Sequence, residues 1–277
     1  MRIVGVVNIT EDSFSDGGRY LDPEAAIAHS RRLRSDGADV VELGAASSHP
    51  NAKTVSADEE RRRLTPVLEA LAGDRFAISV DTAQPQTQWL ALAHGAAYLN
   101  DVRGFPDPRI YEALAASDCR LVVIHSIEGR EITTRVKTDP ATIWARIDAF
   151  FAERLAALQA VGIARERLVV DPGLGFFLGI NPEPSLVVLA RVRQLKARFG
   201  LPILLSPSRK SFLRTLTGRE IADVGSASLA AELYAAWHGV DYIRTHDVAA
   251  LHDALTIIHA IAAADSAPAV ARSKGDG

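Results

Sequence analysis

One stretch, Gly37-Ala38-Asp39-Val40-Val41-Glu42-Leu43, decides the fold, because a glycine ends a helical pattern there and a short apolar strand follows within two residues. Glycine is favoured just past a helix end because it enters the left-handed region without strain. The same joint returns at Gly95-Ala96-Ala97 and Gly239-Val240-Asp241, and other helical patterns end at Gly73, Gly162 and Gly200. This repeated unit predicts a parallel sheet with crossover helices.

Eight apolar runs read as buried strands. They are Ile3–Val7, Asp39–Leu43, Ala77–Val80, Ala97–Leu99, Leu121–Ile124, Leu168–Val170, Ile203–Leu205 and Tyr242–Ile243. Two helix starts are also marked, by Asp22 before Pro23 and by the capping box Ser56-Ala57-Asp58-Glu59. Eight units favour closure, since an open doubly wound sheet typically has roughly five to seven strands. We expect one α/β domain, a (β/α)8 TIM barrel over residues 1–264, followed by a disordered tail over 265–277.

The composition is that of an ordinary globular protein, with 48% hydrophobic residues among 277. The net charge of −3 offers no basic surface to nucleic acid or to an anionic membrane. No uninterrupted apolar run approaches the ~18 residues of a membrane span, and no signal-peptide pattern opens the chain. One cysteine, Cys119, excludes an intramolecular disulfide framework and fits a reducing compartment. We expect a cytoplasmic protein with neither a nucleic-acid nor a membrane partner.

Polar residues stand at the carboxyl ends of the predicted strands, where barrel enzymes place their active sites. Each alone is as easily a helix cap or an ion-pair partner, but the barrel makes them converge, and burying so many without a ligand is costly. His125 has two open interpretations, a pocket-lining residue or an ordinary buried hydrogen bond. The strand-end residues are Asn8, Glu42, Ser47-Ser48-His49, Asp81, Asn100-Asp101, His125, Asp171, Ser208-Arg209-Lys210, Arg244 and His246.

These residues divide by charge. Asp81, Asn100 and Asp171 offer acceptors and one amide, which suit a flat heterocycle with adjacent N–H donors. Basic groups follow the last two strands, where barrels often bind phosphate; they are Arg209, Lys210, Arg244 and His246. The sequence therefore predicts a substrate with an amide-rich ring at one end and a phosphate at the other. We expect the polar loops 10–18 and 44–53 to act as lids, with plain surface loops as the alternative.

Six segments of the sequence resemble the dihydropteroate synthase family, in that family's order and over essentially the whole barrel. Two of the motifs, the first and the fifth below, are specific, whereas the Asp-Pro-Gly turn alone is weak. The segments are Val7-Asn8-Ile9-Thr10-Glu11-Asp12-Ser13-Phe14-Ser15-Asp16-Gly17-Gly18, Ser79-Val80-Asp81-Thr82, Leu99-Asn100-Asp101-Val102, Asp171-Pro172-Gly173-Leu174-Gly175-Phe176, Ser208-Arg209-Lys210-Ser211 and Arg244-Thr245-His246-Asp247.

The family joins 6-hydroxymethyl-7,8-dihydropterin diphosphate to p-aminobenzoate and releases diphosphate and 7,8-dihydropteroate. The resemblance implies a homodimer through outer helices and a Mg²⁺ cofactor bound by Asn8. It implies catalytic roles for Asp81, Lys210, Arg244 and His246. It places the pterin at Asp81, Asn100, Asp171 and Lys210, and the diphosphate at Asn8, His49, Arg244 and His246. It places p-aminobenzoate at Phe14, Ser48, Pro50, Phe176, Ser208 and Lys210.

The sequence departs from the family pattern around two loops. Most members read Gly-Glu-Ser-Thr-Arg-Pro-Gly-Ala where this chain has Ala45-Ala46-Ser47-Ser48-His49-Pro50-Asn51-Ala52, so His49 replaces a phosphate-binding arginine only partly, and only when protonated. Phe177-Leu178 replace a glycine and a lysine, and Ser206-Pro207 replace Gly-x before Ser208. Together with segments 99–108 and 118–126, these departures resemble the mobile sulfonamide-resistant dihydropteroate synthases. Extra bulk near the projecting sulfonyl substituent predicts tolerance of sulfonamides.

Three other functions compete with this one. Methyltetrahydrofolate-dependent methyltransferases share the barrel and the Asp/Asn/Asp set but need no diphosphate site, so Ser208-Arg209-Lys210-Ser211 speaks against them. A barrel aldolase would use Lys210 as a Schiff base, but the adjacent Arg209 favours anion binding. A non-catalytic pterin-binding barrel stays open because the arginine of the second loop is lost.

Overall fold

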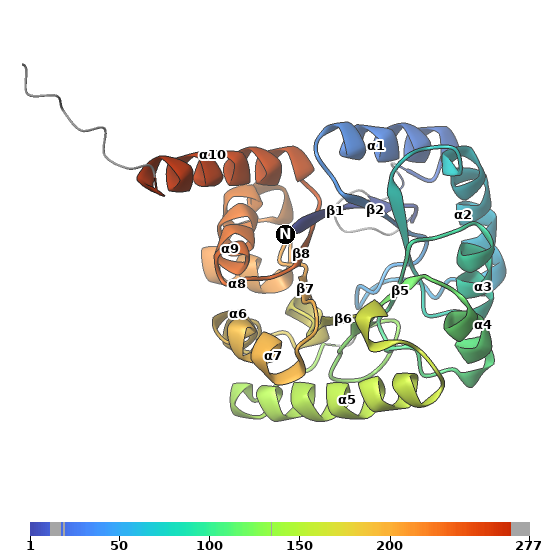
Figure 1. The fold of residues 1–277 in the computed structure, drawn as a ribbon. Coiled ribbons are helices and arrows are strands. Elements are labelled where there is room, and N and C mark those ends of the chain that lie inside the picture. Colours follow the sequence, from blue (N-terminus) through green and yellow to red (C-terminus); the bar gives the residue numbers. More distant parts are fainter. Residues whose placement is uncertain (12–17, 19, 134, 267–277) are drawn as a thin grey trace, which may run out of the picture.

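The eight predicted strands all form, and they pair in parallel in the order β6-β5-β4-β3-β2-β1-β8-β7. A bridge between Val170 and Ile203 joins β6 to β7 and closes the ring. The computed structural model, which describes residues 1–11, 18, 20–133 and 135–266, therefore confirms the (β/α)8 TIM barrel (Figure 1). The strands are β1 (Arg2–Asn8), β2 (Val40–Gly44), β3 (Ala77–Asp81), β4 (Tyr98–Asp101), β5 (Arg120–Ile124), β6 (Leu168–Asp171), β7 (Leu204–Leu205) and β8 (Tyr242–Thr245).

Helices surround the barrel, and their starts follow the sequence signals. Asp22 accepts from the Ala25 amide at 3.3 Å, and Ser56 accepts from the Glu59 amide at 3.2 Å, so both predicted N-caps are confirmed. The helices are α1 (Pro23–Ser35), α2 (Ala57–Leu71), α3 (Pro85–Ala93), α4 (Tyr111–Ala116), α5 (Pro140–Ala160), α6 (Glu183–Ala190), α7 (Val192–Phe199), α8 (Ser211–Thr217), α9 (Gly225–Trp237) and α10 (Val248–Ser266), with short 3-10 turns η1 (Pro108–Ile110), η2 (Arg165–Arg167), η3 (Gly175–Phe177) and η4 (Ile221–Asp223).

The amino end of the barrel is closed by packed side chains. One buried cluster fills it, made of Val4, Val40, Tyr98, Val122, Val169, Leu204 and Tyr242 among others. A second and larger cluster lies between the strands and the helices. Because the core fills the barrel from below, polar strand ends have access to solvent only at the carboxyl face. That face is where the sequence predicts the site.

Helix α10 leaves much of its apolar surface uncovered. Val248 and Leu251 are buried, whereas Ile257 and Ile261 are 61% and 64% exposed. By length and composition alone its segment Val248–Asp265 would also pass as a membrane span, and only 11% of that segment is buried. The helix runs through residues 265 and 266, and the rest of the predicted tail, 267–277, lies outside the described residues.

Candidate active site

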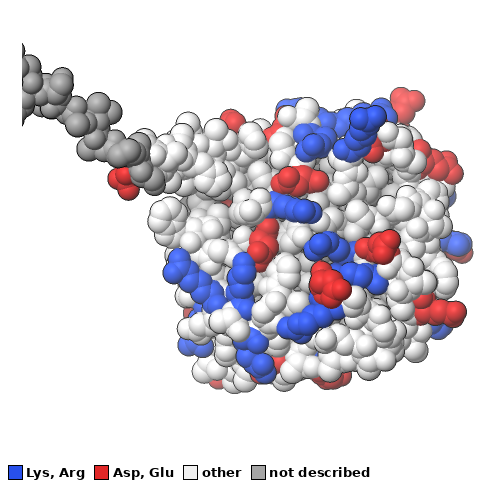
Figure 2. All heavy atoms as spheres, in the orientation of Figure 1, with Lys and Arg blue, Asp and Glu red and all other residues white. Residues whose placement is uncertain are grey.

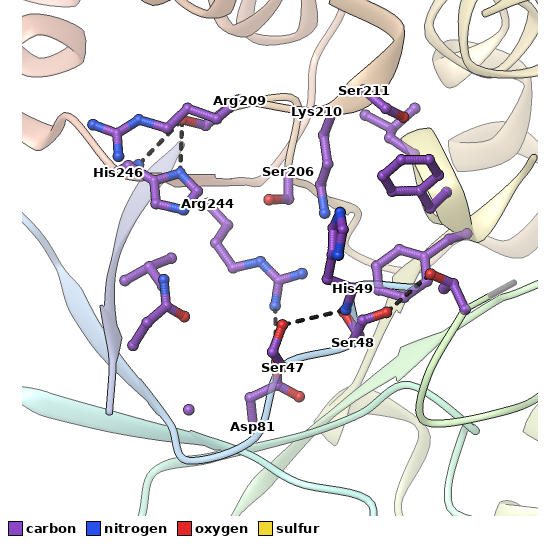
Figure 3. Close-up of a pocket in the computed structure, with 18 of the residues that line it drawn as sticks. Ser47, Ser48, His49, Asp81, Ser206, Arg209, Lys210, Ser211, Arg244 and His246 are labelled. Carbon is purple, nitrogen blue, oxygen red and sulfur yellow. Dashed lines mark hydrogen bonds and ion pairs between the residues drawn. The ribbon is translucent and has the colours of Figure 1, made fainter. Parts of the chain in front are cut away.

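A cavity opens at the carboxyl ends of the strands and brings most of the predicted site residues together (Figure 3). Asn100 and Asp171 lie below it, almost fully buried, and Pro50 lies half-buried outside its lining. Phe14 falls outside the described residues. The predicted residues that line the cavity are Asn8, Ser48, His49, Asp81, Phe176, Ser208, Lys210, Arg244 and His246.

Arg244 is the centre of the deep half of this cavity. Its guanidinium lies 2.7 Å from Glu42, 3.7 Å from Asp81 and 3.9 Å from Asp171. Burial opposes this charge, but the three carboxylates together raise the pKa of Arg244 above its ordinary value. The sequence places Arg244 with the diphosphate; in this structure its side chain extends down from β8 into the carboxylate-rich part of the pocket (Figure 3).

Two of these carboxyl groups resist ionisation. Burial and the neighbouring Glu42 raise the pKa of Asp81 to about 7, although 37% of its side chain still faces solvent. Burial also raises the pKa of Asp171, against the opposing effects of Arg244 and of a hydrogen bond from the Gly173 amide. A carboxyl group that titrates near neutral pH in a cleft is typical of a functional site.

Glu42, a predicted strand-end residue to which the family resemblance gave no role, belongs to the site. Its carboxylate accepts hydrogen bonds from Arg244, from Ser79 at 3.2 Å and from Asn100 at 3.3 Å. The side chain is only 3% exposed. The signal in the sequence was a charged residue inside an otherwise apolar strand, which is costly to bury without a partner.

Lys210 lies near both Arg244 and the aromatic ring of Phe177. Its ammonium lies 4.8 Å from the centre of the Phe177 ring, and burial, with the nearby Arg244, lowers its pKa to about 8. The backbone of the preceding residue, Arg209, is left-handed with φ 56°. Arg209 donates its amide to the Ser228 hydroxyl at 3.0 Å, which holds this strained turn.

His246 and Asn8, which the sequence predicts to bind the diphosphate, both line the cavity. Burial and the cations Arg209, Lys210 and Arg244 lower the pKa of His246 to about 3, so its ring is neutral. Its Nδ1 shares a 3.0 Å hydrogen bond with the Ser208 hydroxyl, which leaves Nε2 for another partner. The imidazole therefore offers hydrogen bonding rather than positive charge.

His49 and Phe176 form the opposite wall. Their rings meet edge to face with centroids 5.4 Å apart, and in Figure 3 His49 lies on the other side of Arg244 from His246. Burial and the nearby Arg135 and Arg214 lower the pKa of His49. The loop that carries His49 is anchored where the Ser48 carbonyl accepts both the amide and the hydroxyl of Thr133, at 3.0 and 2.9 Å.

His125 does not line the cavity. It is 3% exposed, and its Nδ1 lies 3.1 Å from the Pro172 carbonyl oxygen. Burial lowers its pKa to about 4. Of the two interpretations of this histidine, the ordinary buried hydrogen bond is confirmed.

Comparison with known proteins agrees with this geometry. The family described as "Pterin binding enzyme" matches residues 4–246. The type-2 dihydropteroate synthase of Escherichia coli is 56% identical over 94% of this chain and 95% of its own length. The dihydropteroate synthase of Escherichia coli strain K12 is 35% identical over 93% of this chain and 90% of its own. The higher identity to type-2 confirms the resemblance to that branch.

Solved structures agree as well. A Xanthomonas albilineans dihydropteroate synthase with 4-aminobenzoic acid has a TM-score of 0.85 and 37% identity, covering 96% of this chain and 94% of that one. A Yersinia pestis dihydropteroate synthase in complex with a sulfonamide has a TM-score of 0.86 and 32% identity, covering 95% and 94%. The closed barrel, the converging polar residues and these matches show that the chain belongs to the dihydropteroate synthase family of transferases.

Proposed function

We propose that the two halves of the cavity divide the work of a dihydropteroate synthase. The enzyme joins 6-hydroxymethyl-7,8-dihydropterin diphosphate to p-aminobenzoate in folate biosynthesis. The deep half, with Asp81, Asn100, Asp171 and Lys210, binds the pterin ring. The single observation that carries this assignment is the set of acceptors around Arg244, which matches the N–H edge of a flat heterocycle.

The diphosphate takes the side of the cavity formed by Asn8 and His246. When the bond from the pterin methylene to the diphosphate oxygen breaks, the electron pair leaves with the diphosphate. The neutral His246 ring donates a hydrogen bond to the leaving group, and Arg244 lies within the same cavity to meet part of its charge. The Asp81 anion stabilises the methylene cation that remains.

The arylamine completes the reaction. Its nitrogen attacks the methylene carbon, and the new C–N bond leaves an ammonium that releases one proton. The cavity lining includes Phe176, Ser48, Ser208 and Lys210, which are proposed to bind p-aminobenzoate. Pro50 and Phe14 are proposed to complete this side. His49 packs beside Phe176. It is therefore proposed to contact p-aminobenzoate as well as the diphosphate.

The residues at the phosphate side fit Mg²⁺. Mg²⁺ keeps most of its water and binds through one or two protein oxygens plus substrate phosphates. Asn8 supplies an amide oxygen at the end of β1, and the described residues hold no cluster of three acidic, histidine or cysteine groups that would bind a metal alone. Bound there with the substrate, the ion would neutralise charge on the departing diphosphate.

Sulfonamide tolerance is proposed from the Phe176-Phe177 pair in η3. Phe177 packs under Lys210, and Phe176 projects beside His49 into the cavity, whereas Leu178 is fully buried in the core. The two rings thus narrow the outer end of the p-aminobenzoate side. A sulfonamide carries a substituent beyond the length of p-aminobenzoate, and it would meet this wall where the substrate does not.

Complementation tests the activity and the tolerance together. The gene is expressed in a synthase-deleted bacterium grown without thymidine. We expect growth that persists at ordinary sulfamethoxazole doses, and lower tolerance when Phe177→Gly removes the ring that this chain has in place of the family's glycine. No rescue would refute catalysis and favour a non-catalytic pterin-binding barrel. Rescue that ordinary doses abolish would refute the tolerance.

We also propose that the enzyme is a cytoplasmic homodimer that binds neither nucleic acid nor membrane. Helices α9 and α10 pack against each other, and both expose apolar side chains, which are Tyr234, Trp237, Ile257 and Ile261. The α10 side of the molecule shows little charge, whereas Lys, Arg, Asp and Glu mix over the rest of the face in Figure 2. Such a patch suits a second copy of the chain. Cys119 is buried, and its pKa is raised to about 12, so it forms no part of this surface.

A further inference from the structure

Glu42 is a buried carboxylate, and each of its two oxygens accepts hydrogen bonds from different residues. Oε1 accepts from Arg244 Nη1 at 2.7 Å, and Oε2 accepts from the Ser79 hydroxyl at 3.2 Å and from Asn100 Nδ2 at 3.3 Å. The three partners come from β8, β3 and β4. A single side chain of β2 therefore links strands on both sides of β2, at the floor of the cavity that it also lines.

These hydrogen bonds determine which end of the Asn100 carboxamide faces Glu42. A carboxylate paired with arginine only accepts hydrogen bonds, so the amide must present its NH₂ group to it. The carboxamide oxygen, Oδ1, then points away from Glu42. Among the described residues this oxygen has no hydrogen-bond partner, although it is fully buried. A buried acceptor without a partner is costly and needs a donor from elsewhere.

We propose that Glu42 is a positioning residue of the pterin site, which fixes Asn100 so that its carboxamide oxygen accepts an N–H of the ring. The inference rests on the proposed ring-binding role of Asn100 and adds the group that sets its hydrogen-bonding sense. Glu42 does not touch the reacting atoms. Its effect belongs to ring recognition, not to the departure of diphosphate.

Glu42→Gln tests the idea because it reverses the pattern at constant shape. Arg244 needs an acceptor, so the new amide turns its oxygen to Arg244 and its NH₂ to Asn100. Asn100 must then turn its own oxygen toward the new glutamine and its NH₂ group toward the ring. That NH₂ group would face a ring N–H, and two donors form no hydrogen bond. We expect the affinity for 6-hydroxymethyl-7,8-dihydropterin, which lacks the diphosphate, to fall by about 10- to 100-fold, the usual consequence of an unpaired buried group.

The second probe is inorganic diphosphate with Mg²⁺, measured by titration calorimetry on the same proteins. Its affinity should stay within about twofold, because the acceptor for Arg244 is retained. Ser79→Ala is the matched control, since it removes a neighbouring hydrogen bond to Glu42 and leaves Asn100 unchanged; ring affinity should also stay within about twofold. Thermal unfolding of each variant shows whether the barrel is intact.

A compensating pair separates positioning from general damage. Asn100→Asp alone sets two carboxylates against each other and should lose ring binding. The double variant Glu42→Gln with Asn100→Asp restores a donor facing an acceptor and again presents an oxygen to the ring, so ring affinity should recover at least tenfold over either single variant. Unchanged ring affinity in Glu42→Gln, equal losses for both probes, or no recovery in the double variant would each overturn the inference. Absence of ring binding by the unaltered enzyme would instead overturn the proposed pterin site.

Discussion

Glu232→Gln is expected to stabilise the enzyme at high pH and to leave its stability unchanged at low pH. Glu232 lies on α9 against β8, is 2% exposed, and keeps Oε1 without a partner among the described residues. Burial raises its pKa from 4.5 to about 7; the hydrogen bond to Thr245 opposes this rise, and the charge of Asp247 adds to it. Glutamine has nearly the same shape and still accepts from Thr245.

The sign of the effect follows from the raised pKa. Below 4.5 the group is protonated in the folded and unfolded states alike, and the substitution changes little. Between 4.5 and 7 the unfolded chain ionises first, so folding stability falls as pH rises. Above pH 7 Glu232 is ionised in both the folded and the unfolded state. In the folded state it is then a buried anion with one oxygen that accepts no hydrogen bond from the described residues. At about 1.4 kcal/mol per pKa unit, the penalty that glutamine removes there is about 3 kcal/mol.

Urea unfolding at pH 4.5 and pH 9, at one protein concentration, measures this difference. We expect the variant to match the parent at pH 4.5 and to exceed it by about 3 kcal/mol at pH 9, with Tm higher by about 6 to 10 °C. Glu153→Gln, at an exposed site on α5, is the control and should be neutral at both pH values. An equal change at both pH values, or a loss at pH 9, would refute the reasoning, because a packing effect does not depend on pH.

Four shorter predictions concern the site and the assembly. Lys210→Ala should lower kcat/KM by at least about 100-fold in a diphosphate-release assay, since one cation serves both substrates; near-full activity would contradict this. For the unaltered enzyme kcat/KM should rise as pH increases through about 7, where Asp81 ionises. The Asp81→Asn variant should have a low kcat/KM that does not rise over this pH range. Trp237→Glu, at a side chain 69% exposed, should yield monomers by sedimentation; a dimer that survives refutes the interface. Gly173→Ala should cost at least about 2 kcal/mol in urea unfolding, because φ is 76° and a Cβ would lie 2.5 Å from a backbone oxygen, whereas Gly95→Ala, with φ 72° and open space, should cost less.

The barrel could be predicted from the sequence because each strand is a separate apolar run and most of these runs follow a glycine that ends a helix. The predicted strands match the observed ones to within one or two residues, as with Ile203–Leu205 for Leu204–Leu205. What the pattern does not give is where a helical segment breaks. The segments before β7 and β8 each contain two helices. Between α6 and α7 the helical periodicity continues across a bend at Arg191, whereas α8 ends at Gly218 and α9 begins only after η4.

Site residues that belong to a sequence motif could be predicted. Contacts that depend on the reach of a long side chain could not. Asp81 and Asn100 lie at strand ends, and their place follows from strand register. Glu42 was singled out at a strand end, but its role was not predicted because its partner lies far along the chain. Its carboxylate pairs with Arg244, which is 202 residues away on β8, and such a contact has no local sequence pattern. His49 was assigned to the phosphate by alignment with an arginine, whereas packing of its loop places it against Phe176.

The distribution of charge explains why the two halves of the cavity need different partners. In the deep half, the carboxyl groups of Glu42, Asp81 and Asp171 lie close to the cations Arg244 and Lys210, so charges of opposite sign offset one another there. A nearly neutral, acceptor-rich surface suits an uncharged ring. The diphosphate finds little positive charge there, because Arg244 is already paired and His246 is neutral. We propose that Arg244 meets only part of its charge and that Arg209 and Mg²⁺ at Asn8 meet the rest. On this argument, removing Mg²⁺ should weaken binding of the pterin diphosphate far more than binding of the pterin alone.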